Sequence, residues 1–297
     1  MAHVHHAASQ SRRSLALALA VTVSYTTIEL AAGFLTGSLA LLADAVHMLG
    51  DNAALAVALV AGWLAARPAT PERTYGLKRA EVLAALANGV ALVALAVWIA
   101  VEAVGRLDDP PTVSGGWVLA VALGGIAANV SAAAVLARTR AGSLNVEAAL
   151  RHVLADLLGS LGVVAAALVL LATGWREADP VAGLLIAGLV LASSWTILRD
   201  SVSILLEASP RGIDTRAVGA RLAAAPGVVE VHDLHIWTIT SGFPALSAHV
   251  LVGAGEDCHR RRRELERLLA DEFGIVHSTL QVEHAAGNGL VELGRFR

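Results

Sequence analysis

The chain has 297 residues, of which 56% are hydrophobic and only 16% are charged, and its net charge at neutral pH is −3. Soluble domains carry about 25% charged residues, so this composition excludes an ordinary soluble protein and is typical of a membrane protein. The slightly acidic net charge gives no indication of a nucleic-acid partner, and the single cysteine excludes an internal disulfide.

Residues 1–13 form a polar tail before the first apolar stretch. The tail contains three histidines, and short His-rich tracts sometimes gather metal ions, although such tails are more often disordered. Arg12 and Arg13 also resemble the start of a signal peptide. The apolar run that follows continues to about Leu35, which is too long for the hydrophobic region of a signal peptide. We therefore expect a cytoplasmic tail followed by a first membrane-spanning helix.

Six apolar runs follow one another, and each is long enough to cross a bilayer core, which takes about 20 helical residues. Glycine and proline mark the connections between them, for example at Asp109-Pro110-Pro111. The pattern predicts an all-α transmembrane domain of six helices over residues 14–207. The six runs lie near residues 14–36, 38–66, 79–105, 115–137, 145–173 and 180–206.

Basic residues are concentrated on one side of this predicted domain. The first, third and fifth connections contain at most one arginine each, whereas the second contains Arg67, Arg73 and Lys78 and the fourth contains Arg138 and Arg140. The positive-inside rule therefore places the basic connections and both termini in the cytoplasm. We expect a multi-pass protein of the cell membrane, meaning the inner or plasma membrane, in contact with the lipid bilayer.

From residue 208 onward the composition changes, because charged residues return and strand-type periodicity appears. The order of predicted elements is α-β-β-α-β, which favours a small two-layer α/β domain of the ferredoxin-like, metallochaperone-like type over residues 208–297. The elements are expected at Asp214–Ala225, Val228–Thr240, Ala245–Val252, Cys258–Phe273 and Thr279–His284.

Two His-x-x-x-Asp pairs lie inside apolar runs, His47 with Asp51 and His152 with Asp156. Residues four apart share one face of a helix. An ionisable side chain in a spanning helix costs about 2.5–3.5 kcal/mol on insertion scales, so these residues need a reason to be there. One interpretation is a hydrogen-bond network that packs the helices. The repeated spacing, with Arg151 as the only nearby basic residue, favours a shared metal site.

The four side chains have the chemistry of a site for a divalent metal of the zinc type. Two imidazoles and two carboxylates complete a tetrahedral shell, and the two carboxylates cancel the charge of the ion. Imidazole ligands favour Zn²⁺ or Cd²⁺ over Mg²⁺ or Mn²⁺, which prefer oxygen ligands. Imidazoles also titrate near neutral pH, and metal must displace their protons. A site that holds either protons or metal is the minimum requirement for antiport.

Other polar residues lie in the apolar runs. Asp44 either lines the aqueous approach to the metal site or lies near the membrane surface. Glu29, Asn88 and Asn129 are expected to form hydrogen bonds between helices, or alternatively to orient the metal ligands.

The chain resembles the cation diffusion facilitators, a family of proton-coupled zinc and cation efflux transporters. The resemblance rests on GFLTGSLALLADAVHMLGDNAAL, YGLKRAEVLAALANG, NVEAALRHVLADLLGSLGVV and VHDLHIWTITSG, which occur in family order within residues 14–285. It implies six membrane helices, a cytoplasmic metallochaperone-like domain and a homodimer. It also implies that His47, Asp51, His152 and Asp156 bind the transported ion, with a preference for zinc and cadmium.

The C-terminal region contains many further candidate ligands. By resemblance, His232, His249, His277 and Glu283 match ligand positions of the family's cytoplasmic domain. Zinc bound there would sense cytoplasmic metal and tighten the dimer. A lone histidine in a strand is usually structural, so this set remains one of two interpretations.

Two other classes of function compete with transport. A membrane-embedded metalloenzyme would need an open position on its zinc and a nearby glutamate base, as in His-Glu-x-x-His, and the chain contains no such motif. A metal sensor that does not transport would leave the two intramembrane pairs unexplained. Transport of zinc out of the cytoplasm in exchange for protons, without enzymatic activity, therefore explains the most features.

Overall fold

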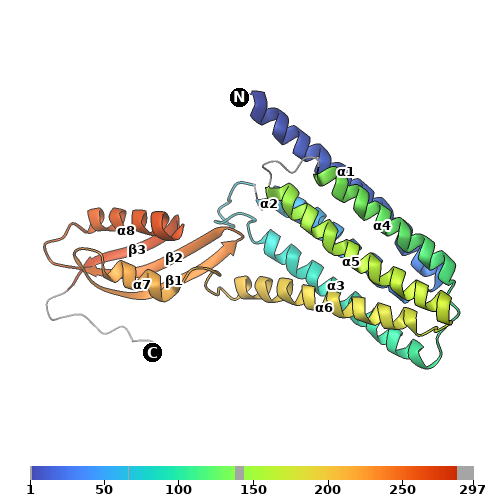
Figure 1. The fold of residues 1–297 in the computed structure, drawn as a ribbon. Helices are drawn as coiled ribbons and strands as arrows, with labels where there is room; N and C mark the ends of the chain where they lie inside the picture. The colour runs from blue at the N-terminus through green and yellow to red at the C-terminus, as the bar shows by residue number, and fades with distance from the viewer. Residues whose placement is uncertain (1, 66, 138–143, 286–297) are drawn as a thin grey trace. The chain divides into compact units, whose positions relative to one another are not determined.

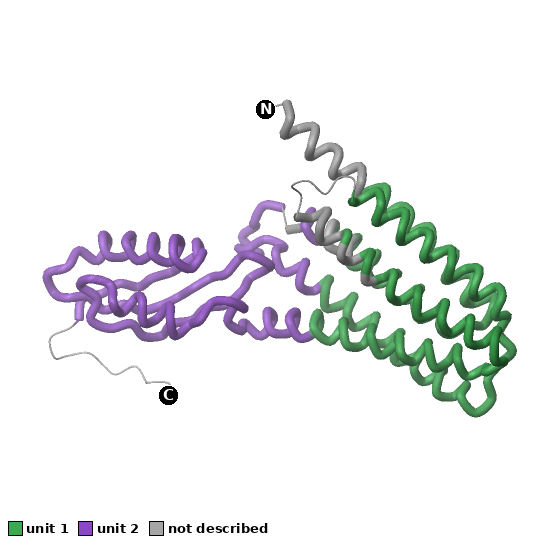
Figure 2. Tube along the Cα trace, viewed as in Figure 1, with its two compact units in different colours: residues 1–60, 84–198 green, residues 61–83, 199–297 purple. Residues whose placement is uncertain are grey.

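The computed structural model describes residues 2–65, 67–137 and 144–285, and for residues 2–15, 55, 58, 59, 65, 144–149, 151, 152 and 155 it describes the backbone only. Figure 1 shows long helices in the first two thirds of the chain and a small sheet with two shorter helices in the last third. Figure 2 colours two compact units, residues 1–60 with 84–198 and residues 61–83 with 199–297. Each unit is described by itself below.

The long helices follow the predicted apolar runs. They are α1 (Ala2–Thr36), α2 (Leu39–Ala65), α3 (Ala80–Asp108), α4 (Gly115–Ala137), α5 (Leu144–Thr173) and α6 (Ala178–Leu205). The bounds of α1 include most of the predicted N-terminal tail, where neither glycine nor proline interrupts a helix.

Within the described residues, five segments are long and apolar enough to cross a membrane, and they lie in α1, α3, α4, α5 and α6. Only 22–28% of each most apolar window is buried inside the protein, and large apolar side chains such as Phe34, Trp117 and Leu185 are exposed. An apolar outer surface of this kind is stable in hydrocarbon and not in water. The 27 residues of α2 correspond to about 40 Å of helix, which also exceeds a bilayer core. The chain is a membrane protein.

The first half of α2 is the centre of the helical unit. Residues 38–46 are all buried, and Leu41 and Val46 belong to a cluster that contains side chains of α3, α4, α5 and α6. Small residues allow this close packing, since a Cβ added at Gly183 of α6 would lie 3.0 Å from the Cβ of Leu39. A helix enclosed in this way holds its side chains in fixed positions relative to four neighbours.

The start of α2 is fixed by an acid from another helix. Asp179 in the first turn of α6 accepts a hydrogen bond from the backbone N–H of Leu39 at 2.7 Å and another from the hydroxyl of Ser38. Ser38 in turn accepts one from the N–H of Leu41 at 3.2 Å. These contacts satisfy N–H groups at a helix start that would otherwise be buried without partners.

The C-terminal domain confirms the predicted α-β-β-α-β order. It consists of α7 (Thr215–Ala223), β1 (Val228–Thr240), β2 (Phe243–Val252), α8 (Cys258–Phe273) and β3 (His277–His284). The sheet order is β1-β2-β3, with β1 and β2 antiparallel and β2 and β3 parallel. Leu222 of α7 and Leu269 of α8 pack with Leu246 and Val250 of the sheet in one core, so the helices cover one face in a two-layer fold.

The hairpin between β1 and β2 is tighter than the sequence predicts. Phe243 and Pro244, expected in the turn, instead pair with Thr240 and Thr238. Gly242 adopts a φ of 71°, a left-handed conformation that glycine adopts without strain. A register shift between Thr238 and Thr240 accommodates the proline.

Candidate metal site

The second helix presents His47 and Asp51 on the same face. They are one helical turn apart, and the Nε2 atom of His47 lies 3.7 Å from Oδ2 of Asp51. The surrounding α2 residues are Ala, Val, Leu, Met and Gly, which pack against neighbouring helices. The sequence pattern therefore predicts this arrangement correctly, because a four-residue spacing on an α-helix allows little else.

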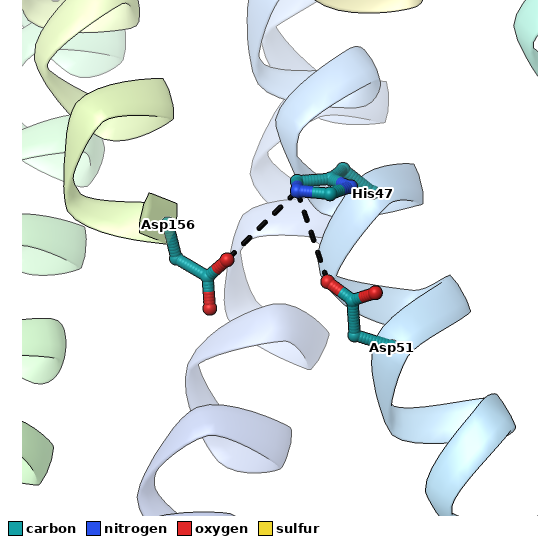
Figure 3. A group of neighbouring side chains, drawn as sticks. All are labelled: His47, Asp51 and Asp156. Carbon is teal, nitrogen blue, oxygen red and sulfur yellow. Dashed lines mark ion pairs between the residues drawn. The ribbon is translucent and has the colours of Figure 1, made fainter. Parts of the chain in front are cut away.

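The fifth helix brings Asp156 to the same point. Its Oδ1 atom lies 3.8 Å from Nε2 of His47, and one ligand atom from each of His47, Asp51 and Asp156 lies within 4.8 Å of the others. Figure 3 shows the imidazole between the two carboxylates, with the acids pointing toward it from two different helices. The three residues share the helical unit.

These separations match the spacing of ligands around one ion. Zinc binds nitrogen and oxygen ligands at about 2.0–2.2 Å, so two ligands at tetrahedral corners lie about 3.4 Å apart. The observed 3.7 and 3.8 Å are longer than a good hydrogen bond and close to this ligand spacing. A small contraction of the three side chains would enclose a divalent ion.

The site is partly accessible. The side chains of His47 and Asp51 are 31% and 30% exposed, whereas that of Asp156 is only 6% exposed. His47 and Asp51 therefore form the accessible side of the site, and Asp156 forms its buried side. Two carboxylates and a neutral imidazole leave a charge of −2 before an ion enters, which a divalent cation balances.

The fourth predicted ligand, His152, lies in α5 one turn before Asp156. Its side chain lies outside the part of the chain that the structure describes. The four-residue spacing places its backbone position on the Asp156 face of α5.

In the C-terminal domain, two of the four predicted ligands face each other. His232 of β1 pairs with His249 of β2 across the sheet, and their ring centroids lie 5.4 Å apart in an edge-to-face arrangement. Glu283 of β3 accepts a hydrogen bond from Gln281, which is the strand partner of His249.

His277 does not join these residues within one chain. It lies four positions before Gln281 on β3, a separation of about 13 Å along a strand. Its Nε2 atom is 3.4 Å from the Tyr75 hydroxyl, and its ring packs against those of Tyr75 and Phe243.

Sequence reasoning missed the role of Asp233 beside these histidines. Asp233 lies at a register shift in β1 and adopts a φ of 51°, which directs it toward His235 at 2.9 Å and His249 at 4.0 Å. The hydrogen bond with His235 is the main reason that the pKa of Asp233 is lowered from its ordinary value. The signal in the sequence is His232-Asp233-Leu234-His235, where two polar residues in succession break the alternation of a strand.

The chain matches two family models. The model described as the cation efflux transmembrane domain matches residues 15–206, and the model described as the cation efflux protein cytoplasmic domain matches residues 210–285. Together they cover nearly all of the described chain.

Curated relatives match over almost their entire length. The chain is 40% identical to the zinc transporter ZitB of Escherichia coli strain K12, covering 97% of this chain and 95% of that protein. It is also 40% identical to the metal cation efflux system protein CzcD of Cupriavidus metallidurans (95% and 90%). The cadmium, cobalt and zinc/H(+)-K(+) antiporter of Bacillus velezensis shows 40% identity (97% and 94%).

A solved structure, the metal-bound C-terminal domain of the CzcD transporter from Cuprividus metallidurans, is 40% identical over 24% of this chain and 99% of its own length, with a TM-score of 0.23. The two matching family models and the full-length relatives describe transporters, so the chain is a divalent-cation efflux protein and not an enzyme. It belongs to the cation diffusion facilitator family of cation efflux transporters.

Proposed function

We propose that this chain exports zinc from the cytoplasm in exchange for protons, through a site formed by His47, Asp51, His152 and Asp156. The observation that carries the proposal is the convergence of His47, Asp51 and Asp156, whose ligand atoms lie within 4.8 Å of one another. His152 is the fourth ligand in this proposal. Its position four residues before Asp156 repeats the spacing of His47 and Asp51.

The ligand types support zinc as the main cargo. Imidazole nitrogen favours borderline-soft ions such as Zn²⁺ and Cd²⁺ over Mg²⁺. Two carboxylates neutralise the ion, which lowers the cost of holding it away from bulk water. The names of the relatives, a zinc transporter and an antiporter of cadmium, cobalt and zinc, agree with this ligand preference.

Proton exchange follows from the same ligands. A metal ion can bind only when its imidazole and carboxylate ligands are deprotonated, so loading releases protons. When the site faces the opposite side of the membrane, protons compete for the same atoms and help the ion to leave. Alternating exposure of the site to the two sides would make the exchange cyclic.

A flux experiment tests the proposal. The purified protein is reconstituted into lipid vesicles with an acidic interior, zinc is added outside, and internal zinc is followed with a trapped fluorescent indicator. We expect zinc entry that depends on the pH difference and stops when an ionophore collapses it. Zinc entry at the same rate without a pH difference would contradict proton exchange, and the absence of any zinc entry would contradict transport of this cargo.

We further propose that zinc binds to the cytoplasmic domain as a regulator and tightens a homodimer. His232, His249 and Glu283 are the proposed ligands, and His277 would contribute only across two chains, because it lies about 13 Å from the His249 position along the sheet. The number of zinc ions bound by the full-length protein tests this. The double variant His232→Ala/His249→Ala should bind fewer zinc ions per chain. Its dimer should also be weaker, so it should dissociate into monomers at a higher protein concentration than the wild type does.

In this proposal the protein lies in the cell membrane, with both termini in the cytoplasm. The proposed divisions remain a cytoplasmic tail at 1–13, a transmembrane domain at 14–207 and a cytoplasmic domain at 208–297. The concentration of basic residues in the second and fourth connections supports this orientation. Accessibility of engineered cysteines at the two termini in whole cells, compared with lysed cells, tests it.

A further inference from the structure

A second group of buried polar side chains lies beside the candidate metal site. Tyr25 and Glu29 of α1, Asp44 of α2 and Ser160 of α5 are all nearly inaccessible, with Glu29 at 0% and Asp44 at 1% exposure. The group belongs to the helical unit. None of these residues is a proposed metal ligand, and two of them are acids.

The hydrogen bonds around Glu29 can all be satisfied when its carboxyl group carries a proton. The Tyr25 hydroxyl lies 3.1 Å from Oε1 of Glu29 and 3.0 Å from the backbone carbonyl oxygen of Val121 on α4. A hydroxyl has one proton and the carbonyl can only accept. Both contacts are satisfied when Tyr25 donates to Val121 and a protonated Glu29 donates to Tyr25.

The other oxygen of Glu29 supports the same protonation state. No donor reaches Oε2 of Glu29 among the described residues, although this atom is buried. The Asp44 carboxyl lies near Glu29, so the charged forms of the two groups would repel each other. Two buried carboxyl groups that lie near each other can share a proton, because ionisation of both would place two like charges in a low dielectric.

No basic side chain in the neighbouring sequence can replace that proton. Residues 16–64, 115–137 and 153–173 contain no lysine or arginine. Among the described residues, the hydroxyl groups of Tyr25 and Ser160 contact the pair, and His47 and Asp156 of the metal site lie near Asp44. Ser160 donates to Oδ2 of Asp44 at 3.3 Å and accepts from the Asn129 amide at 3.4 Å.

The pair is electrostatically connected to the metal site through Asp44. Asp44 lies one helical turn before His47 on α2 and interacts electrostatically with both His47 and Asp156. A divalent ion bound by those ligands brings positive charge next to Asp44, which favours the ionised form of the Glu29–Asp44 pair. Loss of the ion removes that charge and favours return of the proton.

We propose that Glu29, together with Asp44, is a proton-binding site of the transport cycle that is separate from the metal ligands. The O–H bond of Glu29 breaks when metal binds, and the proton passes through the Asp44 carboxyl to water at the half-exposed side of the metal site. It returns by the reverse route when metal leaves. This inference rests on the proposed zinc–proton exchange and adds a proton carrier that is not itself displaced from the metal.

Proton release on metal binding tests the inference directly. Zinc binding to the full-length protein in detergent is measured by calorimetry in several buffers with different ionisation enthalpies, which gives the number of protons released per zinc. We expect Glu29→Gln to bind zinc and to release fewer protons, by up to one per zinc. Glu29→Asp keeps a carboxyl group and should restore most of the release.

A matched control separates this effect from a general loss of an acid. Glu102 on α3 is 42% exposed and pairs with Arg106 at 2.9 Å, so Glu102→Gln should leave the proton count at the wild-type value. An unchanged count in Glu29→Gln would overturn the inference, and so would loss of zinc binding in both Glu29 variants, which would indicate a structural role. If the wild type itself released no protons on binding zinc, that result would contradict the proposed zinc–proton exchange as a whole, and not the role of Glu29 in particular.

Discussion

Asp156 on α5 lies 3.8 Å from the imidazole of His47 on α2, so one candidate site is assembled from two separate helices. A relative movement of α2 and α5 by a few ångströms would therefore disrupt the ligand set. In the proposed transport cycle, such a rearrangement of packed helices would release the ion and would supply a physical basis for alternating exposure.

Replacement of Asp156 by asparagine removes one ligand charge with almost no change in volume. We expect zinc affinity to fall by at least about 10-fold, since the remaining ligands no longer balance a divalent ion. Equilibrium dialysis of the purified protein measures the affinity. Ser131→Ala, which alters an exposed hydroxyl that donates to the Ala127 carbonyl oxygen of its own helix, should bind zinc as the wild type does.

Asp179 is expected to stabilise the start of α2. Asp179→Ala leaves the N–H of Leu39 and the hydroxyl of Ser38 buried without this acceptor, at a cost of about 1–3 kcal/mol for each unsatisfied group. The melting temperature in detergent should fall clearly. Asp179→Asn retains one acceptor oxygen and should lose less, and equal losses in the two variants would argue against a hydrogen-bonding role.

Leu269 of α8 tests the core of the C-terminal domain. It is fully buried among residues of both helices and the sheet, so Leu269→Ala should reduce the free energy of unfolding of this domain by about 2–5 kcal/mol. Denaturant titration followed by hydrogen exchange of residues 228–284 measures the change. Val276→Ala, at a side chain that is 77% exposed, should have little effect.

The pH dependence of the C-terminal domain is expected to depend on Asp233. Its pKa is lowered in the folded state, mainly by the hydrogen bond with His235. A lowered folded-state pKa contributes stability that is present above the unfolded value of 3.8 and is lost as pH falls through the folded value.

Asp233→Asn isolates this contribution, because asparagine also tolerates the positive φ at this position. The wild type should be more stable than the variant at neutral pH, and the difference should shrink as pH falls below 3.8 and disappear once Asp233 is protonated in the folded state. Melting temperatures measured across this range provide the test. A difference that stays constant with pH would show that the charge of Asp233 is not responsible.

The sequence predicts the helices and the α2 ligand pair well, because these depend on local patterns. Apolar runs define α3 to α6 within a few residues, and a four-residue spacing on a helix places His47 beside Asp51. The meeting of Asp156 with His47 depends on packing between helices that are distant in sequence, and it was indicated by the repeated His-x-x-x-Asp pattern and by the family resemblance.

Features that depend on long-range packing were less predictable. The Tyr25–Glu29–Asp44 group lies on two helices. From the sequence, Glu29 was assigned to hydrogen bonds between helices or to orienting the ligands, and Asp44 to the approach to the metal site or the membrane surface, but no pattern indicated that the two acids lie near each other. The separation of His277 from His249 follows from the strand register, which pairs His249 with Gln281 and His277 with Ala245, and the sequence alone does not determine which residues of two strands pair. Asp233 was missed because a register shift, and not strand alternation, sets its direction.

The most direct test of the central claim compares zinc flux in vesicles containing the wild type with flux in vesicles containing the variant in which His47, Asp51, His152 and Asp156 are all alanine. Protein content, folding and vesicle size are matched, and the pH difference is the same in both. We predict zinc entry with the wild type and only the leak of protein-free vesicles with the variant. Zinc entry by the variant at the wild-type rate would contradict transport through this site.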